Sequence, residues 1–188
     1  EGAPCHYTWY APHDIYGLME CMDGKEKYIA KLDSMFSEHR YWHGNEPCHR
    51  IAYLFNYAGQ PWKTQREVRH IMETEYLNAP GGLSGNDDAG QMSAWYVFSA
   101  MGFYPVCPGT DEYILGAPLF KKATLHFENG KNLVITASDN SDTNRYVDEM
   151  RVNGTVYTKN YLKHNELLQG GTIDFKMTDR PNMQRGTQ

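Results

Sequence analysis

The sequence has no run of basic residues, no long apolar segment and no pair of cysteines with the spacing of a metal site. Its 188 residues carry a formal net charge of −5, which argues against a nucleic-acid partner. No apolar stretch approaches the roughly 20 residues of a membrane span. The four cysteines, at positions 5, 21, 48 and 107, lack CxxC spacing, so we expect free and mostly buried thiols. Nucleic-acid binding and a membrane span are therefore disfavoured.

The sequence also lacks a signal peptide, an internal repeat and a low-complexity segment. Because the chain starts within a motif at Glu1, the missing leader says nothing about export, and we expect a carboxy-terminal piece of a longer protein. Aromatic residues are abundant at 13%, with 4 Trp and 14 Tyr. Flat rings cover the apolar faces of sugars, although tyrosine also serves as ordinary core. The composition thus suits a carbohydrate site without requiring one.

The most informative stretch runs from Leu83 to Tyr104. Glycines flank the loop residues 86–88, and apolar residues then recur at three- and four-residue steps until Gly102, which predicts a loop followed by a buried helix. The helix macrodipole stabilises negative charge at this end, and a glycine-rich loop leaves that charge open to a ligand. The alternative interpretation is an N-cap within a solvated turn.

Upstream of this loop, the apolar periodicity predicts amphipathic helices joined by short loops. With the helix after Leu83 they make about five helices between residues 12 and 102, an arrangement that stacks antiparallel pairs. Residues 37–44 are polar and aromatic and predict a loop. The predicted upstream helices run from Pro12 to Met22, from Lys25 to Phe36, from an N-cap at Asn45 to Phe55, and from Trp62 to Tyr76.

Beyond Pro105 the pattern changes to short alternating strands separated by turns. Residues 128–130, Asn153-Gly154 and Gly170-Gly171 are hairpin signals. We therefore predict a multidomain α+β chain, with a helical domain over residues 1–105 and a small antiparallel β-sandwich over residues 106–188 that contains no evident catalytic residue. The predicted strands are Tyr113–Leu115, Ala123–Phe127, Leu133–Ala137, Glu149–Val152, Val156–Tyr157 and Thr172–Met177.

Four stretches together carry a resemblance to a known family. They are EGAPCHYTWYAPHD at the start, NEPCH, NYAGQPWKTQ and GNDDAGQMSAWYVFSAMGFYPV. These long strings closely resemble the calcium-dependent exo-α-mannosidases of glycoside hydrolase family 92. The resemblance implies that residues 1–105 form the carboxy-terminal part of an α/α toroid, a partial (α/α)6 barrel, followed by the family's β domain.

The same resemblance implies an inverting glycosidase that releases mannose from the non-reducing ends of α-mannosides, such as a mannose-containing oligosaccharide or the glycan of a glycoprotein (N-glycan or mannan type). It also implies Ca²⁺ as cofactor, the missing amino-terminal part of the same enzyme as partner, and a periplasmic or extracellular location. From the resemblance we expect a longer segment where this chain has residues 37–44, and in the family that segment helps to recognise the second sugar. Two other classes stay open: a non-catalytic carbohydrate-binding protein, and an accessory structural fragment.

Inverting hydrolysis needs an acid for the departing oxygen and a carboxylate for the attacking water, about 6.5–9.5 Å apart. Asp88 is the candidate base, with Asp87 or Asn86 holding it, and the resemblance places the base at the same aspartate. The resemblance alone assigns the acid to Glu1. From the residues alone, a frayed first residue without a role is the simpler interpretation.

Oxygen ligands for a hard cation are available at Asn45, Glu46 and Asp88. Asn45 and Glu46 would equally suit a helix start, as N-cap and as dipole compensation. Calcium beside Asp88 would keep that carboxylate ionised and could bind sugar hydroxyls. His43 and His49 are poor calcium ligands, so sugar hydrogen bonding and core packing are both open for them. The candidate pocket walls and sugar hydrogen-bonders are Tyr7, Trp9, His13, Asp14, Trp42, His43, Asn86 and Gln91.

Overall fold

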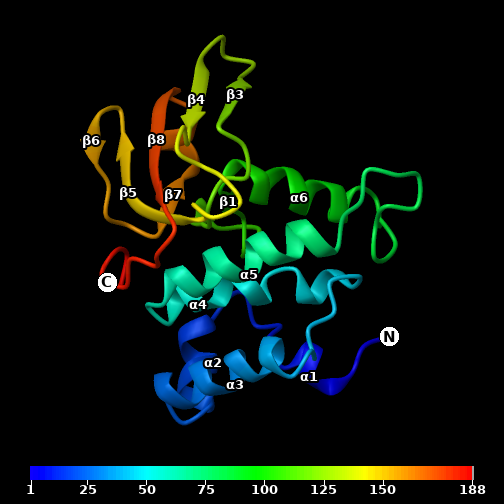
Figure 1. Cartoon of the computed structure of the whole chain (residues 1–188). Helices are drawn as coiled ribbons and strands as arrows, with labels where there is room; N and C mark the ends of the chain where they lie inside the picture. Colours follow the sequence, from blue (N-terminus) through cyan, green and yellow to red (C-terminus); the bar gives the residue numbers. More distant parts are fainter. Residues whose placement is uncertain (188) are drawn as a thin grey trace.

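The computed structural model describes residues 1–187 and places most helices before the strands along the chain (Figure 1). Helix α5 runs between the α2–α3 pair and the sheets. Within the described range no helix has both the length and the hydrophobicity to cross a bilayer. The helical elements are α1 (Pro4–Tyr7), α2 (Ile15–Cys21), α3 (Lys25–Ser37), the 3₁₀ turns η1 (Glu46–Cys48) and η2 (Ile51–Tyr53), α4 (Leu54–Tyr57), α5 (Pro61–Thr74) and α6 (Gln91–Met101), with α7 (His164–Leu167) among the strands.

Local chemistry explains where the predicted helices begin and end. The Asp14 side chain caps α2 by accepting a hydrogen bond from the Gly17 backbone N–H at 2.8 Å. Helix α6 ends at Gly102, whose φ of 99° is left-handed and therefore favours glycine. The helices predicted over Lys25–Phe36 and around residues 62–76 and 92–100 are confirmed as α3, α5 and α6. The helix predicted from Pro12 is also present, but as α2 it begins at Ile15.

The helix predicted from Asn45 is the exception. Two 3₁₀ turns and the short α4 replace a continuous α-helix over residues 46–57, and the Asn45 side chain does not cap η1. Its amide instead donates to Glu1 Oε2 at 3.3 Å. A contact between residues far apart in sequence therefore outweighs the local capping preference at Asn45.

The strands form two sheets, and they pair differently from the prediction. Strands β1, β2 and β7 make an antiparallel three-stranded sheet; the second sheet has the order β3-β4-β8-β5-β6. Because β4 and β8 run parallel, this sheet is mixed, and the expectation of a wholly antiparallel domain is wrong. Gly170-Gly171 follows α7 instead of closing a hairpin. The strands are β1 (Phe103–Tyr104), β2 (Glu112–Leu115), β3 (Lys122–His126), β4 (Asn132–Thr136), β5 (Tyr146–Val152), β6 (Thr155–Val156), β7 (Tyr161–Lys163) and β8 (Gly171–Thr178).

The described chain has two hydrophobic cores, and Phe98 of α6 packs against both. The helical core surrounds Trp95, and the β core surrounds Phe175. Val106 belongs to the helical core, so that core extends past residue 105. Helix α5 joins the two parts through Gln65, whose Oε1 accepts from the Val147 backbone N–H at 3.0 Å. The toroid and the domain division at residue 105 stay predictions, but α5 and the strands are packed together.

Candidate active site

Three carboxylates from distant segments come together in the folded chain. Asn45 Nδ2 donates to Glu1 Oε2 at 3.3 Å, which brings the first residue to the η1 segment. Burial raises the pKa of Glu46, and the nearby carboxylates of Asp88 and Glu1 raise it further. One Glu46 oxygen, Oε1, is buried and has no hydrogen-bond partner within residues 1–187. A buried carboxylate oxygen without a partner, beside two further carboxylates, is a position where a cation or a proton would be stabilised.

The loop before α6 presents Asp88 through an unusual backbone. Asp88, Ala89 and Gly90 follow one another with φ values of 45°, 58° and 92°, all left-handed. For a non-glycine residue such as Ala89 this conformation costs on the order of 1 kcal/mol or more, so surrounding contacts must impose it. Asp87 supplies them: its Oδ1 accepts from the Ser93 backbone N–H at 2.9 Å and from the Ser93 hydroxyl at 3.0 Å. Asp87 therefore ties the loop to α6 and leaves Asp88 exposed.

A cleft of about 510 Å³ contains both Glu46 and Asp88 in its wall. This volume lies within the usual range for small-molecule sites. The guanidinium of Arg50 lies 4.3 Å from the centre of the Tyr10 ring, an arrangement that orders one side of the wall. The remaining lining residues are Tyr10, Pro47, Arg50, Gln91, Ala94, Phe98, Tyr104, Pro105 and Pro108.

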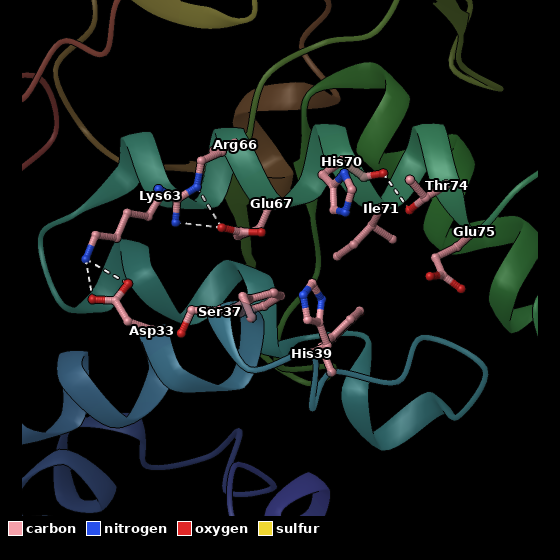
Figure 2. Close-up of a pocket in the computed structure, with 12 residues that line it drawn as sticks. Asp33, Ser37, His39, Lys63, Arg66, Glu67, His70, Ile71, Thr74 and Glu75 are labelled. Carbon is pink, nitrogen blue, oxygen red and sulfur yellow. Dashed lines mark hydrogen bonds and ion pairs between the residues drawn. The ribbon is translucent and has the colours of Figure 1, made fainter.

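A second cavity, of about 780 Å³, lies elsewhere, between α3 and α5 (Figure 2). Ion pairs surround it: Lys63 Nζ lies 2.5 Å from Asp33 Oδ2, and Arg66 pairs with Glu67 on the same helix. None of the three converging carboxylates lines it. Four of its charged side chains are paired with one another, whereas the smaller cleft has Glu46 and Asp88 in its wall and is the better candidate for chemistry.

Two predicted pocket walls are core residues instead. Trp9 is 1% exposed and packs edge-on against Tyr28, with ring centres 5.3 Å apart. His43 is also 1% exposed, and both ring nitrogens are used: Nδ1 by the Tyr41 hydroxyl at 2.7 Å and Nε2 by the Tyr76 hydroxyl at 2.6 Å. A sugar can reach neither side chain, so the assignment of Trp9 and His43 to substrate binding is corrected.

Most other predicted contacts also lie outside the cleft wall. Asp14 caps α2, and His13 beside it is exposed. The Tyr7 hydroxyl accepts from the Gly2 backbone N–H at 2.9 Å, and the Trp42 ring lies 5.8 Å from the His6 ring. Asn86 is exposed on the Asp88 loop. Of the eight predicted substrate contacts, Gln91 alone lines the cleft.

The sequence reasoning missed Tyr10, Arg50, Phe98 and Tyr104, all of which line the cleft. Tyr10 adjoins Trp9 in the first family block, and Arg50 directly follows NEPCH. Phe98 and Tyr104 lie within the α6 stretch, where the helical pattern predicts burial but does not distinguish a core face from a cleft wall. The sequence offered one signal for these four residues, namely that they lie in or next to the family blocks that contain the candidate carboxylates.

The donor set partly fits the predicted cation. Glu46 and Asp88 are neighbouring hard oxygen donors, and the partnerless buried Oε1 of Glu46 is the atom that a cation would satisfy. Among residues 1–187 there is no group of three or more His, Cys, Asp and Glu side chains arranged to hold a metal. Asn45, the third predicted ligand, directs its amide nitrogen to Glu1. These residues would supply only part of a coordination shell.

Comparison with known proteins adds a consistent match. A model of the glycosyl hydrolase family 92 catalytic domain matches residues 1–179. A solved family GH92 α-mannosidase from Bacteroides thetaiotaomicron aligns with a TM-score of 0.96 at 44% identity, over 100% of this chain and 26% of that one. The structure of the same mannosidase in complex with mannoimidazole aligns with a TM-score of 0.95 at 43% identity, over 100% of this chain and 27% of that one.

Two further similar proteins are also glycosidases. A family GH92 inverting mannosidase from Bacteroides thetaiotaomicron aligns with a TM-score of 0.94 at 46% identity, over 100% of this chain and 29% of that one. An uncharacterized secreted glycosidase from Arthroderma benhamiae is 30% identical over 172 residues, 90% of this chain and 22% of the relative. The chain therefore spans between 22% and 29% of the length of these relatives.

The buried histidines behind the cleft should make stability depend on pH. Burial and the neighbouring His49 together lower the pKa of His43 to about 2, and burial lowers the pKa of His49 to about 4. Both lie below the ordinary value of 6.5, so the unfolded chain binds more protons as the pH falls from 6.5 to 4. Stability is then lost with falling pH, by up to about 1.4 kcal/mol per pH unit for each histidine.

We expect His43→Gln to flatten this loss between pH 6.5 and pH 4, as measured by urea unfolding of the full-length protein at several pH values. His13→Gln removes an exposed histidine and is the matched control. The free energy of unfolding of this variant should depend on pH as steeply as that of the parent protein. A His43→Gln variant whose pH slope equals that of the control would show that His43 does not stay neutral in the folded state.

Proposed function

Because the chain belongs to glycosyl hydrolase family 92, we propose that the protein of which it is part is a calcium-dependent, inverting exo-α-mannosidase. The observation that carries this proposal is the convergence of Glu1, Glu46 and Asp88 beside an aromatic-walled cleft. Such a cleft suits a single sugar ring. Aromatic side chains cover the apolar face of the ring, and carboxylates bind its hydroxyl groups and take part in the hydrolysis.

Asp88 acts as the general base in this proposal. Its side chain is exposed, lines the cleft, and directly follows Asp87, which anchors the loop to α6. A water held by Asp88 attacks the anomeric carbon from the face opposite the departing oxygen. Glu1 acts as the general acid, oriented by the amide of Asn45, and gives its proton to that oxygen.

Glu46 and Asp88 would hold the calcium ion, together with groups outside this chain, water or the sugar itself. When bound, calcium supplies positive charge that keeps Asp88 ionised and favours binding of vicinal sugar hydroxyls. The residues of this chain do the rest. Tyr10, Phe98 and Tyr104 cover the ring, and Gln91 contributes a polar group beside the base.

The proposed substrates are α-mannosides with free non-reducing ends, of N-glycan or mannan type. Mannoimidazole bound to the related Bacteroides mannosidase supports a mannose-shaped site. The amino-terminal remainder of the same enzyme is the proposed partner, in keeping with the small share of the relatives' length that this chain spans. A periplasmic or extracellular location is proposed, supported by the name of the Arthroderma relative, a secreted glycosidase.

Calcium dependence is the first expectation. Chelation of the full-length protein should abolish hydrolysis of an aryl α-mannoside, and added Ca²⁺ should restore it. Glu46→Gln removes one negative ligand and should raise the calcium concentration needed for half-maximal rate, whereas Glu20→Gln, an exposed carboxylate on α2, should not. Full activity of the chelated protein would remove the metal from this proposal.

The roles of base and acid should separate by leaving group. Asp88→Asn should lower kcat by at least the ~10²–10⁴ typical of a general base for good and poor leaving groups alike. Glu1→Gln should slow natural mannosides strongly but an activated aryl mannoside much less, since its departing oxygen scarcely needs a proton.

The measurement is kcat of both variants on two leaving groups at several calcium concentrations, with Glu20→Gln as control. Recovery of Asp88→Asn by high calcium alone would show that Asp88 is only a metal ligand and would transfer the base role to Asp87.

A further inference from the structure

A chain of hydrogen bonds connects the helical core to the cleft. His49 Nε2 lies 3.0 Å from the backbone oxygen of His43. On the other side of the ring, His49 Nδ1 lies 3.4 Å from Gln91 Nε2, and the same Gln91 nitrogen donates to the Tyr104 hydroxyl at 3.0 Å. Gln91 and Tyr104 line the cleft, whereas His49 is 1% exposed behind them.

The partners fix the proton on the His49 ring. A backbone carbonyl can only accept, so His49 Nε2 must carry the hydrogen that faces the His43 oxygen. Burial lowers the pKa of His49 to about 4, so near pH 7 the ring is neutral and has a single N–H. His49 Nδ1 is therefore an acceptor, and it requires a donor opposite it.

That requirement orients the Gln91 amide. Only the NH₂ end can face His49 Nδ1, since the carbonyl end would set two acceptors against each other. The two hydrogens of Gln91 Nε2 are then directed to His49 and Tyr104. Gln91 Oε1 contacts neither of these partners and makes no hydrogen bond within residues 1–187, and the residue lines the cleft together with Asp88.

The same chain of hydrogen bonds orients Tyr104. Its hydroxyl oxygen accepts from Gln91, which leaves the Tyr104 O–H free to donate. Burial raises the pKa of Tyr104, so the hydroxyl keeps its hydrogen at neutral pH. The cleft thereby presents one acceptor, Gln91 Oε1, and one donor, Tyr104 O–H, at fixed neighbouring positions.

We propose that His49 is a positioning residue, which through Gln91 fixes this acceptor and donor pair for the hydroxyl groups of the sugar. A hydroxyl group both donates and accepts, so a matched pair of this kind binds it in one orientation. The inference rests on the proposed function, because it takes the cleft to be the sugar site. His49 itself does not contact the substrate.

The side chain of His49 can be changed without loosening its backbone. The indole N–H of Trp95 donates to the His49 backbone oxygen at 2.8 Å and holds the segment whatever side chain follows. His49→Gln places an amide N–H near the position of Nε2 and keeps the donor to His43, but it removes the acceptor opposite Gln91. His49→Asn places an amide oxygen near Nδ1 and keeps that acceptor.

The test is a double-mutant cycle in the full-length protein, with kcat/KM on an aryl α-mannoside as the readout. We expect His49→Gln and Gln91→Met each to lower kcat/KM by at least tenfold, toward the ~10²-fold that misplacement can cost. The double variant should be no slower than the slower single variant, because His49 acts through Gln91. Independent, multiplying losses would overturn the proposal.

His49→Asn is the rescue variant and should retain most of kcat/KM. If His49→Gln does not fold, His49→Asn decides the question alone, since a loss as large as that of Gln91→Met would overturn the proposal. Crystal structures of the full-length parent and His49→Gln give a readout independent of activity. Displacement of Gln91 from Tyr104 in the variant supports positioning even if the parent hydrolyses no mannoside, and an unmoved Gln91 refutes it.

Discussion

Two carboxylates of like charge, Glu46 and Asp88, lie beside each other in one cleft, and much of the nearby structure serves to keep them there. Bringing such groups together is unfavourable unless a cation or a shared proton compensates. The left-handed backbone of residues 88–90 presents Asp88, and Asp87 secures that backbone through Ser93. The neighbouring carboxylates raise the pKa of Glu46, and a cation bound beside them would offset their repulsion.

The wall behind these carboxylates is rigid for an identifiable reason. Trp95 of α6 donates to the backbone of His49, and the Tyr76 hydroxyl donates to the Met92 backbone oxygen at 3.0 Å while it contacts His43. These buried polar contacts join the segment around η1 to the start of α6. Because buried hydrogen bonds are costly to leave unmade, the distance between the Glu46 and Asp88 segments is set by the core and not by the loops themselves.

Local patterns in the sequence were sufficient for the helices with clear caps. Gly102 ends α6 as predicted and apolar periodicity located α3 and α5, whereas the helix expected from Pro12 begins at Ile15, after a cap at Asp14 that was not predicted. Contacts between distant segments were not accessible in the same way. The diversion of Asn45 to Glu1 and the parallel pairing of β4 with β8 both depend on residues that no local window contains.

The candidate site likewise was predictable from the sequence only in part. The resemblance directed attention to the blocks that hold Glu1, Glu46 and Asp88, which the fold brings together. Residue type alone did not separate a buried aromatic or histidine from one that lines a cleft, so Trp9 and His43 were misplaced and Tyr104 was overlooked. The most direct test of the account is a crystal structure of the full-length protein with mannoimidazole. The account requires the inhibitor in the cleft against Asp88 and Gln91; an inhibitor bound in the cavity between α3 and α5, with that cleft empty, would contradict it.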